Sequence, residues 1–165
     1  MTQADDAALL DVPEPRSGCP VNLTAELLGD RWSLLVLRDL TFGGPSHYRE
    51  LLTGSTEGIA TNILSARLTK LVASGMLTKR PDPTHSQRFD YCLTEAAIDF
   101  LPVLVAISTW ASRWLPVDPE MASVAHALHE GGTRLQSRFM RELREEHLLG
   151  RPAPDTALRH SLGAG

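Results

Sequence analysis

Apolar residues recur at helical spacing in three short segments near the start of the chain. Residues 20–30 carry leucines at that spacing and reach Gly29, which ends a helix, and Asp30, which can cap the next one. Residues 31–40 form a second helix, and residues 47–54 form a third of two turns before a tight turn at 55–58. The pattern of the second helix predicts a buried stripe made of Trp32, Leu35, Val36 and Leu40.

Residues 60–73 form a fourth helical segment whose polar side is unusual. Leu64, Leu68 and Leu71 share one face of the helix, whereas the opposite face holds only small residues: Asn62, Ala66, Thr69 and Ala73, with Ser65 on the flank. A helix face that only meets water usually carries charged residues. This face is therefore either a plain solvated surface or a surface on which another molecule lies closely.

The periodicity changes from helical to alternating after Gly75. Residues 88–93 alternate apolar and polar side chains, which is the pattern of a half-buried strand, and residues 76–80 have strand character. The segment between them contains two prolines. Residues 76–93 are therefore expected to form a β-hairpin with a long tip at 81–87.

A longer helix is predicted from Thr94, which can cap it, to about residue 115, with a bend at Pro102. It carries two apolar stripes, one of Phe100, Val103, Ile107, Trp110 and Trp114 and one of Ala97, Leu101, Leu104, Val105 and Ala111. A helix at the surface of a monomer needs one buried stripe. The second stripe indicates packing against the same helix of a second subunit, or cover by the C-terminal extension.

The remaining residues predict two more helices and a tail. Residues 121–130 are helical, and a capping box from Thr133 to Gln136 opens a last helix with Leu135, Phe139 and Leu143 inward. We therefore divide the chain into a flexible acidic tail (1–18), a folded domain with the long helix (19–115), a helical extension (116–150) and a disordered tail (151–165).

Composition and charge exclude several classes of protein. The net charge is −4, and only residues 28–93, with eight Lys or Arg against six Asp or Glu, are basic. Two cysteines do not make a disulfide scaffold, the N-terminus is not a secretory signal, and no apolar run reaches about 18 residues. The sequence predicts a cytoplasmic protein with no membrane partner. It has no phosphate-binding glycine loop or nucleophile elbow, so neither an enzyme nor a cofactor is expected.

The order of elements predicts a mostly α fold with a small β-hairpin wing, a winged helix-turn-helix with C-terminal dimerisation helices. Short side chains suit a helix that enters the major groove of DNA, where they can contact base edges. The candidate base contacts are Thr61, Asn62, Ser65, Ala66 and Thr69, although Thr61 could instead cap the helix. Candidate phosphate contacts are Lys70, Lys79, Arg80 and Arg88, with Thr84, His85 and Ser86 at the wing tip. His85 has no second ligand at useful spacing, so no metal is predicted.

The residues "ELLGDRWSLLVLRDLTFGG", "HYRELL", "GIATNILSARLTKLVASGML" and "RFDYCLTE" occur in the order found in one family. From Cys19 to about Trp114, the chain resembles the HxlR-type winged helix-turn-helix transcriptional regulators. This resemblance implies a bacterial or archaeal homodimer that binds double-stranded DNA at an inverted repeat in a promoter. It also implies dimer packing through the first helix and the long helix, here Leu101, Leu104, Val105, Ile107, Trp110 and Trp114.

The resemblance has two departures and one further implication. The family usually has two basic residues where this chain has Ser46 and His47. A serine usually opens the recognition helix, where this chain has Ala60 and Thr61. The candidate DNA contacts in the first region are Ser46, His47 and Arg49. A cysteine at the place of Cys19 serves some members as a thiol sensor, whereas Cys92 is expected to be buried and inert. The alternatives are a small-molecule effector at the dimer interface near Trp110 and Trp114, and a protein-binding module without DNA binding.

Overall fold

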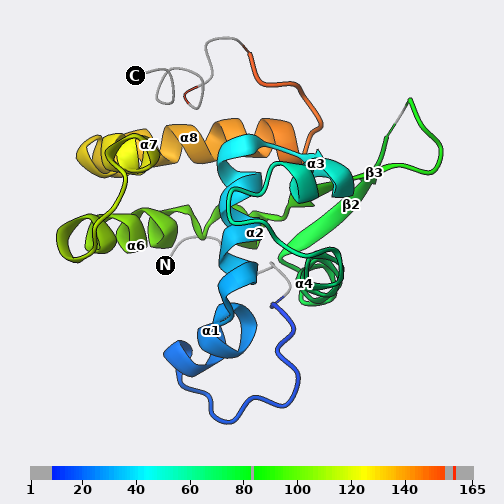
Figure 1. Cartoon of the computed structure of the whole chain (residues 1–165), viewed down its shortest axis with the longest axis horizontal. Helices are drawn as coiled ribbons and strands as arrows, with labels where there is room; N and C mark the ends of the chain where they lie inside the picture. The colour runs from blue at the N-terminus through cyan, green and yellow to red at the C-terminus, as the bar shows by residue number, and fades with distance from the viewer. Residues whose placement is uncertain (1–8, 83, 155–157, 159–165) are drawn as a thin grey trace.

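The computed structural model describes residues 9–82, 84–154 and 158. Figure 1 shows α2 at the centre, with α1 at one end, α3, α4 and the β-hairpin on one side, and α6 to α8 on the other. The elements in chain order are α1 (Pro20–Leu28), α2 (Arg31–Gly43), β1 (Ser46–His47), α3 (Tyr48–Thr53), α4 (Thr61–Ala73), β2 (Leu77–Pro81), β3 (Phe89–Leu93), α5 (Glu95–Ile98), α6 (Leu101–Trp114), α7 (Pro119–Glu130) and α8 (Gly132–His147).

The predicted helices α1 to α4 form for the reasons read from their patterns. Asp30 caps α2 by accepting from the backbone N–H groups of Trp32 and Ser33 at 3.1 and 2.9 Å. The expected stripe of α2 is right for Val36 and Leu40, which are buried, whereas Trp32 and Leu35 are half-buried. On α4, the leucine stripe of Leu64, Leu68 and Leu71 lies in the hydrophobic core. The polar side of α4 is thereby held outward.

The hairpin is confirmed and gains a third strand. β2 pairs antiparallel with β3 from Leu77↔Leu93 to Pro81↔Phe89, and β1 pairs with the other side of β3 through Ser46↔Tyr91. The sheet order is β1-β3-β2. A strand of two residues has no periodicity to read, which is why β1 was not predicted.

The predicted long helix is divided into α5 and α6, with Pro102 in the first turn of α6, where a missing N–H is tolerated. The stripe of Ala97, Leu101, Leu104 and Val105 is buried in this chain, whereas Val103, Ile107, Trp110 and Trp114 are exposed. By length and composition alone, Glu95–Trp114 is apolar enough to cross a membrane, which is weak evidence because the core helix of a globular domain meets the same criteria. One of its stripes nevertheless lies in the core of this domain.

The C-terminal extension is packed onto the helix-turn-helix rather than added at its edge. The rings of Phe42 on α2 and Phe139 on α8 stack with centroids 6.1 Å apart. His147 is buried, accepts from the Leu93 N–H at Nδ1 (3.0 Å) and lies 3.1 Å from the Leu40 carbonyl through Nε2. Because Nδ1 accepts, the proton is on Nε2 and is donated to Leu40. One imidazole therefore joins α8 to β3 and to α2.

Three predictions about the last helix and the two tails need correction. The capping box from Thr133 to Gln136 is not formed, because α8 begins at Gly132 and the Gln136 amide donates to the Leu128 carbonyl at 3.2 Å. The N-terminal tail is not free at residues 10–12, where Leu10 and Val12 pack against the core and the Asp11 N–H donates to Ser74. The predicted disordered C-terminal tail is also not free at Leu158, which is buried in the core and donates its N–H to the Glu142 carboxylate at 2.7 Å. Residues 1–8, 155–157 and 159–165 of the predicted tails lie outside the described residues.

Candidate DNA-binding surface

The small polar residues of α4 lie together on its exposed side. Thr61, Ser65 and Thr69 follow one another at a spacing of four residues, and Asn62 and Ala66 lie beside them; all five are exposed. The helix is capped by Ala60, without a side-chain hydrogen bond, so Thr61 is the first helical residue rather than the cap. Short side chains and the backbone N–H groups of the first turn are therefore presented on one open surface.

The position of α4 against α3 is fixed by Tyr48, the first residue of α3. Its hydroxyl donates to the Thr61 carbonyl at 2.9 Å and accepts from the Ser65 hydroxyl at 3.4 Å. One side chain from α3 thus orients the first turn of α4. Within the candidate surface, Ser65 is the residue whose hydroxyl is already engaged by a neighbour.

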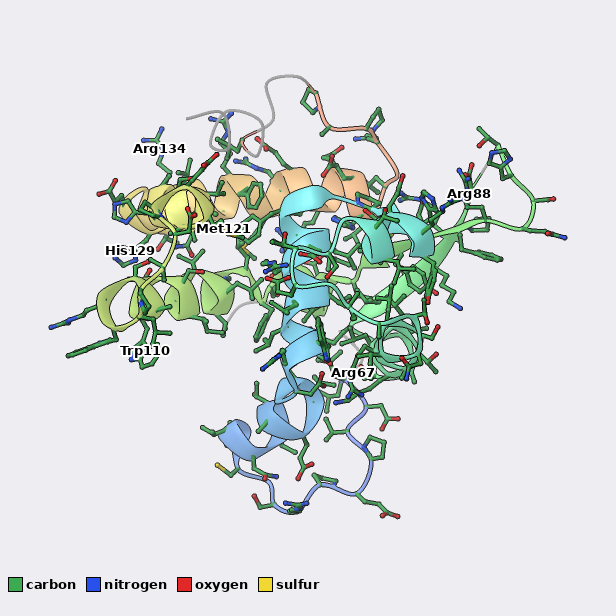
Figure 2. The ribbon with its side chains drawn as sticks, viewed as in Figure 1. Arg67, Arg88, Trp110, Met121, His129 and Arg134 are labelled. Carbon is green, nitrogen blue, oxygen red and sulfur yellow. The ribbon has the colours of Figure 1, made fainter. Side chains whose placement is uncertain are left out.

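Lys70 lies on the other side of α4 and does not face the candidate surface. Its ammonium donates to the Glu26 carbonyl at 3.2 Å and to Asp30 at 3.4 Å. Arg67 is paired with the same carboxylate at 2.8 Å (Figure 2). Burial opposes the charged form of Asp30, but Ser33, Arg67 and Lys70 outweigh it and lower the pKa. Both cations therefore tie α4 to the start of α2, and this engagement of Lys70 argues against the predicted phosphate contact.

Arg80 is also turned into the protein. Its Nη1 donates to the carbonyls of Glu146 and His147 at 3.0 and 3.2 Å, at the C-terminal end of α8. A cation at that end of a helix is favoured by the helix dipole. The prediction that Arg80 contacts phosphate needs correction, because its guanidinium holds β2 against α8.

Of the three candidates before α4, only Arg49 is exposed. Ser46 and His47 form β1 and are half-buried, and the Ser46 hydroxyl donates to the Gly44 carbonyl at 3.1 Å. The His47 ring contacts Glu50 through Nδ1, and its backbone N–H donates to the same carboxylate at 3.1 Å. His47 thus caps α3. Ser46 and His47 are structural in this arrangement, whereas Arg49 remains on the surface.

The wing tip is organised by Asp82. This carboxylate accepts from the N–H and the hydroxyl of Thr84 at 2.7 and 2.6 Å and pairs with Arg88 at 3.7 Å. The Thr84 bonds, above all, hold the pKa of Asp82 below its usual value. His85 and Ser86 are exposed between these residues, and Figure 2 shows Arg88 on the hairpin. Asp82 therefore holds Thr84 and Arg88 together in the described part of the tip.

The cations that remain on this side of the described chain are few. Arg49 and Lys79 are exposed and make no ion pair with a described residue, although the Lys79 ammonium lies 5.6 Å from the Tyr91 ring centre. Arg88 shares its charge with Asp82. The candidate surface thus consists of the polar face of α4 flanked by Arg49, Lys79 and Arg88. It can hydrogen-bond base edges and neutralise a small number of phosphates.

Comparisons with known proteins match this geometry. A family described as HxlR-like helix-turn-helix matches residues 27–119. An uncharacterized HTH-type transcriptional regulator of Mycobacterium tuberculosis is 32% identical over 133 residues, which are 81% of this chain and 82% of that protein. This chain belongs to the HxlR-like helix-turn-helix family. It is a DNA-binding transcriptional regulator and not an enzyme.

Two solved structures are similar to this HxlR-like regulator. PA1607, described as a transcription factor candidate, is 35% identical with a TM-score of 0.56, over 63% of this chain and 70% of that one. The reduced form of the transcriptional regulator YodB from B. subtilis is 27% identical with a TM-score of 0.50, over 62% of this chain and all of that one. Both similarities agree with the winged helix-turn-helix fold predicted from the sequence.

The two cysteines of this HxlR-like protein have opposite surroundings. Cys19 is exposed at the start of α1, where the N–H groups of Asn22 and Val21 lower the pKa of its thiol. Cys92 is buried in β3, and burial raises the pKa of its thiol. Neither forms a disulfide within the chain. The chain therefore has one accessible thiol with a lowered pKa and one covered thiol with a raised pKa.

The residues of α6 that are exposed in this chain can contact another molecule, and those that are buried cannot. Trp110 and Trp114 are 60% and 64% exposed, and Trp110 lies on the side of α6 opposite α7 and α8 (Figure 2). Val21 of α1 is 76% exposed, and a shallow apolar groove runs between α1 and α6. The predicted interface residues Leu101, Leu104 and Val105 need correction, because they are buried in their own chain. The predicted dimer contact remains a prediction for the exposed residues Ile107, Trp110 and Trp114.

Proposed function

We propose that this HxlR-like regulator acts in the cytoplasm as a homodimer on an inverted-repeat promoter site. The observation that carries the proposal is the exposed face of Thr61, Asn62, Ser65, Ala66 and Thr69 beside the wing. A groove about 12 Å wide admits α4 with these short side chains toward the bases. Arg49, Lys79 and Arg88 contact phosphates on either side, and the wing tip contacts the adjoining backbone.

Dimerisation is supported by the exposed apolar face of α6 and α1. Two tryptophans more than half exposed on one helix face are uncommon on a monomer, and Val103 and Ile107 extend the same face toward Val21. A two-fold axis near this face would place the second copy of α6 against the first. Trp110→Asp is expected to give monomers in sedimentation; an intact dimer would show that another face is used.

Control by oxidants is the second part of the proposal, and Cys19 carries it. Its thiol is exposed, has a lowered pKa and lies at the start of α1, beside the apolar groove to α6. An oxidant or electrophile that modifies Cys19 would act next to the proposed dimer contact and change the spacing of the two α4 helices. A small-molecule effector at the interface around Trp110 and Trp114 is the alternative signal.

The first test is a gel shift of the purified protein with its own promoter region, in dithiothreitol and again after diamide. A sequence-specific shift that diamide abolishes and thiol restores supports both parts of the proposal. Cys19→Ser should keep the shift in diamide, and Cys92→Ala serves as the matched control that should still lose it. A shift indifferent to diamide would contradict the switch. No shift under either condition would favour a protein-binding module.

A further inference from the structure

A cleft with a volume of about 420 Å³ lies inside one chain, between the helix-turn-helix and the C-terminal extension. One wall comes from α2, the opposite wall from α7, and α3 closes one end. Figure 2 shows Met121 of α7, one of its lining residues, on the side of α7 toward α2. This space is distinct from the apolar groove between α1 and α6, which has none of the same lining residues.

The walls of the cleft are apolar, with a flexible rim. Phe42, Leu51, Val124 and Ala125 line it, and Met121 is 64% exposed at its edge. A methionine side chain adapts to ligands of different shapes, and an aromatic ring offers a flat contact. Such a lining suits the apolar body of a small organic molecule.

The charged groups at the cleft carry an excess of negative charge. Arg38 is the cation of the lining, and it donates from Nε and Nη2 to Asp39 and from Nη1 and Nη2 to Glu57, at 2.6–2.9 Å. This guanidinium therefore has little capacity left for an anionic ligand. Asp39 and Glu50 both line the cleft, and His47 contacts Glu50 from outside it.

The carboxylate of Asp39 is partly buried, and Arg38 compensates its negative charge only in part, so a second cation would stabilise it. Its side chain is 26% exposed, and burial, only partly offset by Arg38, raises its pKa. Only one of its oxygens, Oδ1, receives hydrogen bonds from Arg38, and the described part of the chain gives Oδ2 none. A desolvated carboxylate with a free oxygen beside apolar walls is a site for an ammonium group.

We propose that this cleft binds a small apolar cation, a molecule with an aromatic or aliphatic body and one amine or ammonium group. The body lies between Phe42 and Met121, and the ammonium contacts Asp39, with Glu50 at the second acidic position.

The position of the cleft also gives its occupant a route to α4, and this step rests on the proposed DNA-binding function. Arg38 joins α2 to Glu57, which lies in the loop that leads into α4. An ammonium group on Asp39 Oδ2 lies close to the Arg38 guanidinium and repels it, which weakens the Arg38–Glu57 pair. The loop before the recognition helix then loses a constraint, so the occupant lowers the affinity for the promoter site.

The binding test uses calorimetry on the full-length protein with three probes of one shape: 1-naphthylmethylammonium, 1-naphthylmethanol and 1-naphthylacetate. The ammonium is expected to bind at least about tenfold more tightly than the alcohol, and the acetate more weakly than both. Equal binding of the three probes would overturn the proposal.

Variants locate the site and separate it from other surfaces. Asp39→Asn and Glu50→Gln are expected to reduce the preference for the ammonium; Glu50 is exposed and glutamine retains its cap on α3, so this variant carries the test if Asp39→Asn does not fold. Glu130→Gln removes a carboxylate at the far end of α7, and Trp110→Ala removes an exposed aromatic ring; both should leave binding unchanged. Loss of binding only in Trp110→Ala would overturn the assignment to the cleft.

The DNA arm is measured separately by fluorescence anisotropy with the promoter fragment. The saturating ammonium probe should weaken DNA binding several-fold in the wild-type protein, and the alcohol should not. Calorimetric binding with unchanged DNA affinity would overturn the coupling through Arg38 and Glu57. Absence of DNA binding without any probe would instead contradict the proposed function and leave the calorimetric result standing.

Discussion

Replacing Arg80 with alanine separates the role that the sequence predicts from the role that the structure shows. The substitution removes a cation that donates from one nitrogen to two carbonyls at the end of α8. A hydrogen bond to a charged group contributes about 1.5–3 kcal/mol, and two that share one donor nitrogen are not additive. We therefore expect the free energy of unfolding to fall by about 1.5–3 kcal/mol.

Urea denaturation followed by circular dichroism measures this loss. With a slope of about 2 kcal/mol per molar urea, the midpoint should move down by about 1 M, while the slope itself stays unchanged. The salt dependence of DNA binding should keep its wild-type slope, because Arg80 contacts no phosphate.

Lys79→Ala is the matched control, one residue away on the same strand. Its side chain is exposed, so the stability should change by less than about 0.5 kcal/mol. The slope of log affinity against log salt should fall by about 0.9 for each protomer. The reasoning is refuted if Arg80→Ala keeps its unfolding midpoint and lowers the salt slope as Lys79→Ala does.

Three further predictions test other contacts. Asp30→Asn keeps the cap of α2 but removes the charge, so we expect the free energy of unfolding at pH 7 to fall by about 1–2 kcal/mol. Because the pKa of Asp30 is lowered in the fold, the stabilisation by its charge is complete above about pH 4 and is lost as the pH falls. The acid unfolding curves of the two proteins should therefore converge. His147→Phe leaves the Leu93 N–H and the Leu40 carbonyl without this partner and should cost about 2–4 kcal/mol in urea unfolding; an unchanged midpoint would contradict the bridging role. Asn62→Ala should weaken binding to the promoter site by about 1–3 kcal/mol with little effect on unrelated DNA; an unchanged sequence preference would remove Asn62 from the base contacts.

The parts of the fold that depend on local periodicity were predictable from the sequence. The helical spacing of Leu64, Leu68 and Leu71 placed the polar face of α4 outward, and alternation at 88–93 placed β3, because both patterns require one buried side. The long helix shows where this reasoning ends. Both stripes of the predicted long helix are apolar, so the pattern does not distinguish them, and the tertiary packing buries Leu101 and Val105 in the core while Trp110 stays exposed.

The assignment of cations could not be read from the sequence for a different reason. Lys70, Arg80 and Lys79 are alike as residues and lie close to the recognition helix in the chain. Lys70 meets Asp30 from 40 residues away, and Arg80 meets carbonyls from 66 and 67 residues away. Contacts at such separations depend on the complete tertiary packing, so a count of basic residues near α4 overstates the charge available to DNA.

The C-terminal extension holds the wing and α2 in place through several contacts of α8. Arg80 links α8 to β2, and His147 links the same turn to β3 and α2, so the wing and the central helix share one anchor at the end of the extension. Arg144 adds ion pairs to Glu95 and Asp99 at the start of α5 and beyond its end. Arg80, which is engaged by α8 and not exposed toward the candidate surface, therefore makes the position of the wing depend on α8. Because α7 also forms a wall of the cleft at Asp39, the molecule that we propose to bind there would contact both the extension and the Arg38 side chain that pairs with Glu57 in the loop before α4.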